Sequence, residues 1–149
     1  MINVDAFSHL QADQVDRILG LGERRMVSAG TLLGHTDEPV TSFYIILSGQ
    51  AELSYGSQSW EMAIRLAGPG ETFPWAGLGS TGNLVTNCRA RIDMEVLDIP
   101  IDDLTALFRK DPEIGMGFYH GVMELFAGQY RRTLAMLAAN VERELTGMR

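Results

Sequence analysis

The sequence predicts a mainly antiparallel β domain with helices at both ends. Between residues 24 and 100, short apolar runs alternate with turn-forming clusters, which is typical of an antiparallel sandwich or roll. A short helical pattern precedes this region, and a long one without proline follows Pro112. We therefore expect one domain, 1–149, made of an N-terminal helix (1–23), a β region (24–100) and C-terminal helices (101–149).

The first helix is predicted over residues 7–21, where apolar side chains recur at helical spacing and Gly20 and Gly22 provide a stop. In the β region, Ser48-Gly49 and Gly68-Pro69-Gly70 are turn signals, and Asp37 suits a left-handed turn position. The expected strands centre on Val27 and on the apolar runs Leu32-Leu33, Phe43–Leu47, Ala51–Tyr55, Ile64–Ala67 and Met94–Ile99.

A short helix is expected after Pro100, and a long one from 112 to about 146 that Asp111 can cap. Its apolar stripe is too long for one small roll to cover, so we expect a homodimer through this helix. The alternative is that the whole helix packs within one chain. Four glycines in its first half suggest a bend or close packing on the roll: Gly115, Gly117, Gly121 and Gly128. The expected dimer residues are Phe126, Tyr130, Leu134, Leu137 and Val141.

Composition restricts the function classes. The net charge is −7 and there is one lysine, which argues against direct nucleic-acid binding. Residues 1–20 do not resemble a secretory signal, and no run approaches the roughly 20 apolar residues of a membrane span. A cytoplasmic protein without membrane contact is the simplest expectation. The single cysteine, Cys88, lies in a strand-like segment and is expected to be a buried, inert thiol in a reducing compartment.

Several of these segments together resemble the cyclic-nucleotide-binding domain family, the sensor half of catabolite-activator-like regulators. The resemblance implies a β-roll, or double-stranded β-helix of jelly-roll type, whose last helix forms a dimer. Regulators of this kind continue into a winged helix-turn-helix, for which we expect no room before Arg149, so their DNA contact is not carried over. The matching segments are Ala29–Leu33, Phe43–Leu53, Leu66–Glu71, Val96–Pro100 and Asp111–Glu113.

The ligand-binding turn departs from the family pattern. Where the resemblance implies a Gly-Glu pair that holds ribose and phosphate, this sequence has Pro74-Trp75. Proline has no N–H to donate, and the tryptophan ring cannot accept from a hydroxyl group. The family's phosphate-binding arginine falls on Asn83 or Leu84, and its hydroxyl on Val85. The expected pocket residues are Gly70, Glu71, Phe73, Pro74, Trp75, Ala76, Leu84, Val85, Gln129 and Tyr130.

These changes predict that cyclic AMP and cyclic GMP bind weakly or not at all, because a buried phosphate would lose its cation. A shifted loop that turns Arg89 or Arg91 inward would restore one, although their alternation with Cys88 and Ala90 favours an outward face. Trp75 has two interpretations: an aromatic wall for another ligand, or a plug that fills the old site.

Other chemistry has little support. Cupin-like metal enzymes use closely spaced histidines, whereas His9, His35 and His120 are far apart. A haem sensor would need His35, Cys88 or His120 as an axial ligand. We therefore expect no cofactor and no metal, and a non-enzymatic sensory domain that binds a small effector or a protein partner. A genuine cyclic-nucleotide receptor and a cupin-like metal enzyme are the alternatives.

Overall fold

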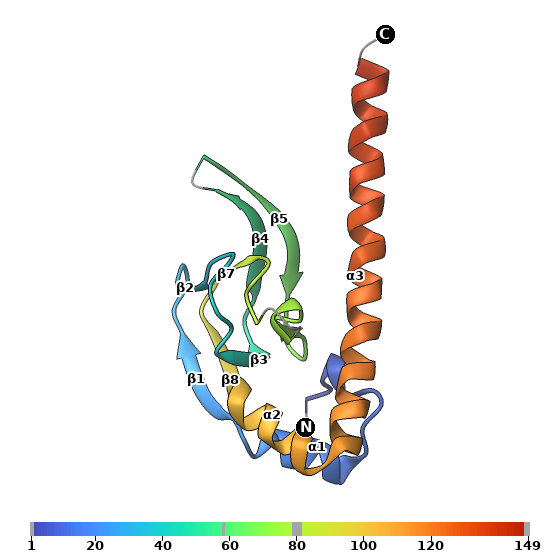
Figure 1. Ribbon diagram of the computed structural model, residues 1–149. Coiled ribbons are helices and arrows are strands. Elements are labelled where there is room, and N and C mark those ends of the chain that lie inside the picture. Colours follow the sequence, from blue (N-terminus) through green and yellow to red (C-terminus); the bar gives the residue numbers. More distant parts are fainter. Residues whose placement is uncertain (1, 58, 79–81, 148–149) are drawn as a thin grey trace.

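The computed structural model describes residues 2–57, 59–78 and 82–147 and shows two packed antiparallel sheets with helices at one end (Figure 1). A 3₁₀ turn (Asp5–Phe7) and α1 (Ala12–Leu19) precede the sheets, and α2 (Ile101–Lys110) and α3 (Pro112–Gly147) follow them. The first sheet has the order β1 (Glu23–Val27), β8 (Met94–Pro100), β3 (Ser42–Ser48), β6 (Thr72–Phe73). The second has the order β2 (Leu32–Gly34), β7 (Asn87–Ala90), β4 (Ala51–Ser57), β5 (Trp60–Ala67).

This architecture confirms the predicted fold class, a jelly-roll-like β domain between a short N-terminal helix and a long C-terminal one. All named strand pairs are antiparallel. The predicted turn at Ser48-Gly49 joins β3 to β4, and Gly49 has φ +90°, where a Cβ would lie 2.4 Å from that of Met94. Asp37 has φ 72°, as its turn position suggested.

The helices and strands differ from expectation mainly at their ends. The first helix spans only Ala12–Leu19, and Phe7, the first residue of the predicted range, belongs to a separate 3₁₀ turn. Strand β5 begins at Trp60, where it pairs with Ser57 of β4. This outer half of the hairpin is exposed, so it lacks the apolar pattern of a buried strand. Asp111 does not act as a side-chain cap in the described contacts: its carboxylate accepts from Arg17 at 2.7 Å.

The core has two parts that together fix the roll and its helices. One part joins the helices to the β3–β8 pair through Phe43, Ile99, Leu104, Ile114 and Phe118. The Phe43 and Phe118 rings meet edge to face, with centroids 5.2 Å apart. The other part fills the interior between the two sheets and includes Ile46, Ala51, Phe73, Cys88, Met94 and Val96.

Helix α3 runs without interruption from the helical end of the molecule and extends past the β4–β5 hairpin (Figure 1). Its buried residues are confined to the first three turns. Two of its glycines allow close packing, but against the N-terminal segment and not against the roll as expected. A Cβ on Gly117 would lie 2.9 Å from the His9 carbonyl oxygen, and one on Gly121 would lie 2.2 Å from that of Ala6. Within the described residues, no helix has the length and apolar content of a membrane span.

Candidate functional site

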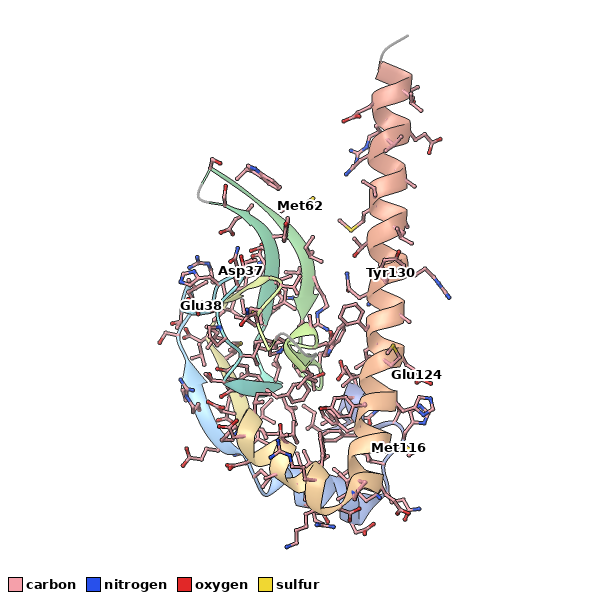
Figure 2. All side chains as sticks on the ribbon, in the orientation of Figure 1. Asp37, Glu38, Met62, Met116, Glu124 and Tyr130 are labelled. Carbon is pink, nitrogen blue, oxygen red and sulfur yellow. The ribbon has the colours of Figure 1, made fainter. Side chains whose placement is uncertain are left out.

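A cavity of about 210 Å³ lies between the roll and the middle of α3. Three parts of the chain form its wall: strands β4 and β5, the two loops around Trp75 and Val85, and one face of α3. Figure 2 shows the side chains that occupy the space between β5 and α3 near the labelled Tyr130. The lining residues are Leu53, Ile64, Arg65, Trp75, Ala76, Val85, Thr86, Phe126, Gln129, Tyr130 and Thr133.

The structure brings half of the sequence-predicted pocket residues to this cavity. Trp75 and Ala76 form the wall next to the roll, Val85 comes from the second loop, and Gln129 and Tyr130 come from α3. Tyr130 is 61% exposed and lies at the rim. The family resemblance is therefore sufficient to find the loops and the helix face that enclose the cavity.

The other predicted pocket residues lie elsewhere. Phe73 is fully buried and stacks on Tyr44, with ring centroids 5.1 Å apart. Pro74 and Leu84 border a separate cavity of about 140 Å³ beside β3. Gly70 turns the chain with φ +84° against the Asn3 carbonyl group.

Glu71, the last of these residues, borders a shallow groove on the other side of Arg65. Its charge acts on that guanidinium group, where it opposes the effect of burial. Glu71 therefore belongs to the surroundings of the arginine and does not line the cavity.

Sequence reasoning missed Arg65, the only charged residue among those that line the cavity. Its guanidinium carbon lies 3.8 Å from the centroid of the Trp75 ring, a cation–π contact. Nη2 donates to the Thr72 carbonyl oxygen, whereas Nε and Nη1 are buried without a hydrogen-bond partner in the described structure. Burial lowers the Arg65 pKa to about 10, although the nearby charges of Glu71 and Asp5 oppose this effect.

Unpartnered buried donors are costly, by roughly 1–3 kcal/mol for each group. None of the ion pairs formed by the described residues includes Arg65. The signal available in the sequence was a single charged residue inside the apolar run Ile64–Ala67. A charge in such a run needs compensation on burial, and here Glu71 and Asp5 are the nearby opposite charges.

A chain of hydrogen bonds holds Trp75 in place. The indole Nε1–H donates to Thr72 Oγ1 at 2.9 Å, and the Thr72 hydroxyl donates to Asp5 Oδ1 at 2.8 Å. Burial raises the Asp5 pKa, with the two hydrogen bonds from Thr72 as the main opposing influence. Trp75 is therefore positioned by the N-terminal segment, and it forms a wall of the cavity without filling it.

Helix α3 also contacts β5 beside the cavity. Gln129 Nε2 lies 3.4 Å from the Ile64 carbonyl oxygen and 3.3 Å from Thr133 Oγ1, and it can donate to both. Gln129 thus links the helix to the strand that carries Arg65. Any ligand that changes the separation of roll and helix would strain these contacts.

The positions at which the resemblance implies contacts to a cyclic phosphate carry other residues in this chain. Val85, where the resemblance implies a hydroxyl group, lines the cavity and is 53% exposed, whereas Leu84, one of the two positions for the arginine, borders the separate cavity beside β3. Arg89 does not compensate, because its Nη1 donates to the Gly30 carbonyl oxygen at 2.9 Å and its side chain is exposed. Arg91 is also exposed and lies outside the cavity lining.

Cys88 fits the expectation of an inert thiol. It is 2% exposed, and burial raises its pKa to about 11. A thiol of this kind is largely protonated at neutral pH and is a poor nucleophile. His35 pairs with Glu38 at 2.9 Å, away from His9 and His120, which lie together where the N-terminal segment meets α3.

Comparison with known proteins supports this architecture. The chain is 27% identical over 139 residues to a protein of Rhodopseudomonas palustris named as a candidate potassium channel protein, covering 93% of this chain and 32% of the relative. The Thermus thermophilus catabolite activator protein superposes with a TM-score of 0.74 at 25% identity, covering 92% of this chain and 63% of that one. The chain therefore spans about a third of the first relative and less than two thirds of the second.

A second solved structure is similar in fold. The c-di-GMP responsive global regulator CLP of Xanthomonas campestris has a TM-score of 0.76 at 18% identity, covering 86% of this chain and 63% of that chain. Residues 24–111 match the family described as cyclic nucleotide-binding domain. Since this match covers more than half of the sequence, the chain belongs to the cyclic nucleotide-binding domain family.

Proposed function

We propose that the chain is a non-enzymatic, cytoplasmic sensory domain that binds a small effector other than a cyclic nucleotide. One observation carries this proposal: Trp75, at the position where the resemblance implies a ribose-binding glutamate, stacks on Arg65 beside an open cavity. The ring blocks the use of this turn for a nucleotide and leaves space for another molecule. The single, buried thiol of Cys88 suits a reducing compartment.

The lining favours an effector with an apolar body and a negative group. Trp75, Phe126 and Tyr130 offer aromatic surface, which binds flat apolar molecules well. Arg65 supplies the charge, with donors left on Nε and Nη1. These two atoms are covered in the present arrangement, so an anionic group reaches them only after a small movement of the Trp75 ring. That ring also borders a neighbouring cavity of about 350 Å³, which gives it room to move.

We further propose that α3 forms a homodimer and transmits the effector signal. The stripe residues Phe126 and Tyr130 are 44% and 61% exposed, and both also line the cavity. A ligand in the cavity would therefore contact side chains that a second chain also contacts. Ligand binding in the cavity would therefore change the stability of the dimer directly, with no helix or strand between the cavity and the interface.

Calorimetric titration tests the choice of ligand. We expect cyclic AMP and cyclic GMP at millimolar concentration to give no saturable binding, because neither the turn nor Val85 offers phosphate a partner. Binding tighter than about 10 µM, roughly −7 kcal/mol, would instead identify a genuine cyclic-nucleotide receptor. A Val85→Arg variant, which adds a cation at the cavity rim, is expected to raise nucleotide affinity above that of the unmodified chain.

The same titration with 2-naphthoate, an aromatic anion of suitable size, tests the proposed effector class. We expect saturable binding that weakens at least tenfold in Arg65→Met, while the neutral 2-naphthamide binds both chains alike. Arg89→Met, which changes an exposed arginine outside the cavity, serves as the matched control. Failure of both naphthyl compounds to bind would contradict a small-molecule site in this cavity.

A further inference from the structure

A second group of chemically active side chains lies away from this cavity, where the N-terminal segment meets α3. His9 Nε2 lies 3.0 Å from Glu124 Oε1, and His120 Nε2 lies 3.6 Å from the same oxygen. The three ligand atoms all lie within 4.8 Å of one another, and all three residues are exposed. Figure 2 shows Glu124 on the side of α3 that faces away from the roll.

The backbone holds these side chains together. His120 and Glu124 are four residues apart on α3, so they lie on one face of the helix. His9 reaches them because Gly117 and Gly121 let the N-terminal segment lie directly on the helix surface. The neighbouring Phe7 is buried in the core, which anchors the segment on the other side of His9. The three positions are therefore set by the fold and not by the mobility of an exposed loop.

The donor set is that of a transition-metal site. Two imidazole groups and a carboxylate are ligands that suit Zn²⁺, which binds them at about 2.0–2.2 Å with tetrahedral geometry. Two ligand atoms of such a site lie about 3.4 Å apart. The two measured separations from Glu124 Oε1, 3.0 and 3.6 Å, bracket this value. A fourth position would stay open to water.

The two imidazole rings are stacked and would have to turn in order to share one ion. The His9 and His120 rings are parallel within 6° with centroids 3.7 Å apart, and both direct Nε2 to one carboxylate oxygen. A metal ion cannot lie in the planes of two parallel rings, so each ring would tilt about its Cβ–Cγ bond on binding. Such a tilt requires no backbone change, because both rings are exposed.

We infer that His9, His120 and Glu124 bind one Zn²⁺ ion per chain. The ion links the N-terminal segment to α3, and the same segment supplies Asp5 to the hydrogen bonds that hold Trp75. Zinc binding therefore stabilises Trp75, which forms a wall of the effector cavity, although the zinc site itself lies outside that cavity. This role does not depend on which effector the cavity takes.

Titration of the chelator-treated chain with ZnCl₂ and with MgCl₂ tests the site. We expect one Zn²⁺ per chain with micromolar affinity, no binding of Mg²⁺, and a rise of several degrees in the thermal unfolding midpoint with zinc. His9→Ala and His120→Ala should each reduce zinc affinity at least tenfold and remove the thermal shift. His35→Ala is the matched control, because His35 is also exposed and also pairs with a glutamate, and it should bind zinc like the unmodified chain.

Equal zinc affinity in the unmodified chain, His9→Ala and His120→Ala would overturn the inference. So would a loss of affinity in His35→Ala of the same size as in the other two variants. Circular dichroism of each variant without metal separates loss of a ligand from loss of the fold. The absorption spectrum of the Co²⁺-loaded chain adds an independent measurement: an intense tetrahedral d–d band that His9→Ala abolishes is expected, and a weak octahedral band would contradict the proposed geometry.

Discussion

Trp75 links the turn after β6 to the strand that carries Arg65. Its indole N–H bonds to Thr72, and its ring covers the Arg65 guanidinium group. The cation–π contact stabilises the arginine. Two of its buried donors, Nε and Nη1, have no hydrogen-bond partner in the described structure, which is unfavourable. Burying a charge of this kind seldom stabilises a fold.

Gly121 is the residue at which the fold depends most directly on the absence of a side chain. A Cβ there would lie 2.2 Å from the Ala6 carbonyl oxygen, a backbone atom that cannot move alone. We expect Gly121→Ala to lower the free energy of unfolding by roughly 1–3 kcal/mol in urea denaturation, despite the better helix propensity of alanine.

Gly128→Ala is the control for this substitution. The nearest atom to a Cβ at Gly128 is the flexible end of Arg132, at 3.7 Å. Without a clash, the helix propensity of alanine should raise the free energy of unfolding by up to about 1 kcal/mol. Equal effects of the two substitutions would show that the N-terminal segment does not pack on α3 as described.

Asp5 makes the free energy of unfolding depend on pH. Because burial raises its pKa in the folded state, the folded chain holds this proton more tightly than the unfolded chain. Its stabilising contribution is therefore present below the ordinary pKa of 3.8 and is lost as the pH rises through the folded-state pKa. Asp5→Asn keeps one of the two acceptor oxygens for Thr72 and has no charge to desolvate.

We therefore expect Asp5→Asn to gain stability relative to the unmodified chain between about pH 3 and pH 7, measured by urea denaturation at each pH. Asp103→Asn removes an exposed carboxyl group from α2 and controls for net charge. A stability difference between Asp5→Asn and the unmodified chain that stays constant with pH, or falls as the pH rises, would contradict the raised pKa.

At the scale of elements, the sequence predicts the helix starts, strands and turns that depend on apolar patterns and on proline and glycine residues. The start of α3 at Pro112 and the turn at Ser48-Gly49 follow from local chemistry, so both were predicted correctly. The outer half of β5 was missed because its pairing with β4 is exposed and leaves no apolar pattern. Strand β6 was missed because two residues, Thr72 and Phe73, are too few to show a period.

The sites were harder to predict than the elements, since they depend on contacts between distant parts of the chain. The resemblance to a family indicated the loops at Trp75 and Val85 but gave no reason to include Arg65. His9 and His120 lie together only because glycines on α3 admit the N-terminal segment. No local pattern in the sequence carries that information.

At the scale of the whole molecule, the exposed stripe of α3 is the main feature left without a partner in one chain. Beyond Val122 the helix has no buried residue, although large apolar side chains continue to its end. A contiguous apolar surface of this kind is typical of an interaction site. The side chains concerned, from 44 to 63% exposed, are Phe126, Tyr130, Leu134, Leu137, Val141 and Leu145.

We expect the chain to be a dimer in solution, with a mass by light scattering of about twice the 16.4 kDa of one chain. Leu137→Glu places a charge in the middle of the stripe, where a partner helix would have to desolvate it, so this variant should be monomeric. Ala139→Glu adds the same charge two residues later, on the opposite side of the helix, and should remain dimeric. If the unmodified chain has the mass of one protomer at high concentration, or if both variants dissociate alike, α3 does not form the proposed interface.

If the dimer forms as expected, the contact of Phe126 and Tyr130 with both the cavity and the partner makes effector affinity depend on assembly. Leu137→Glu should then weaken 2-naphthoate binding without altering the cavity itself.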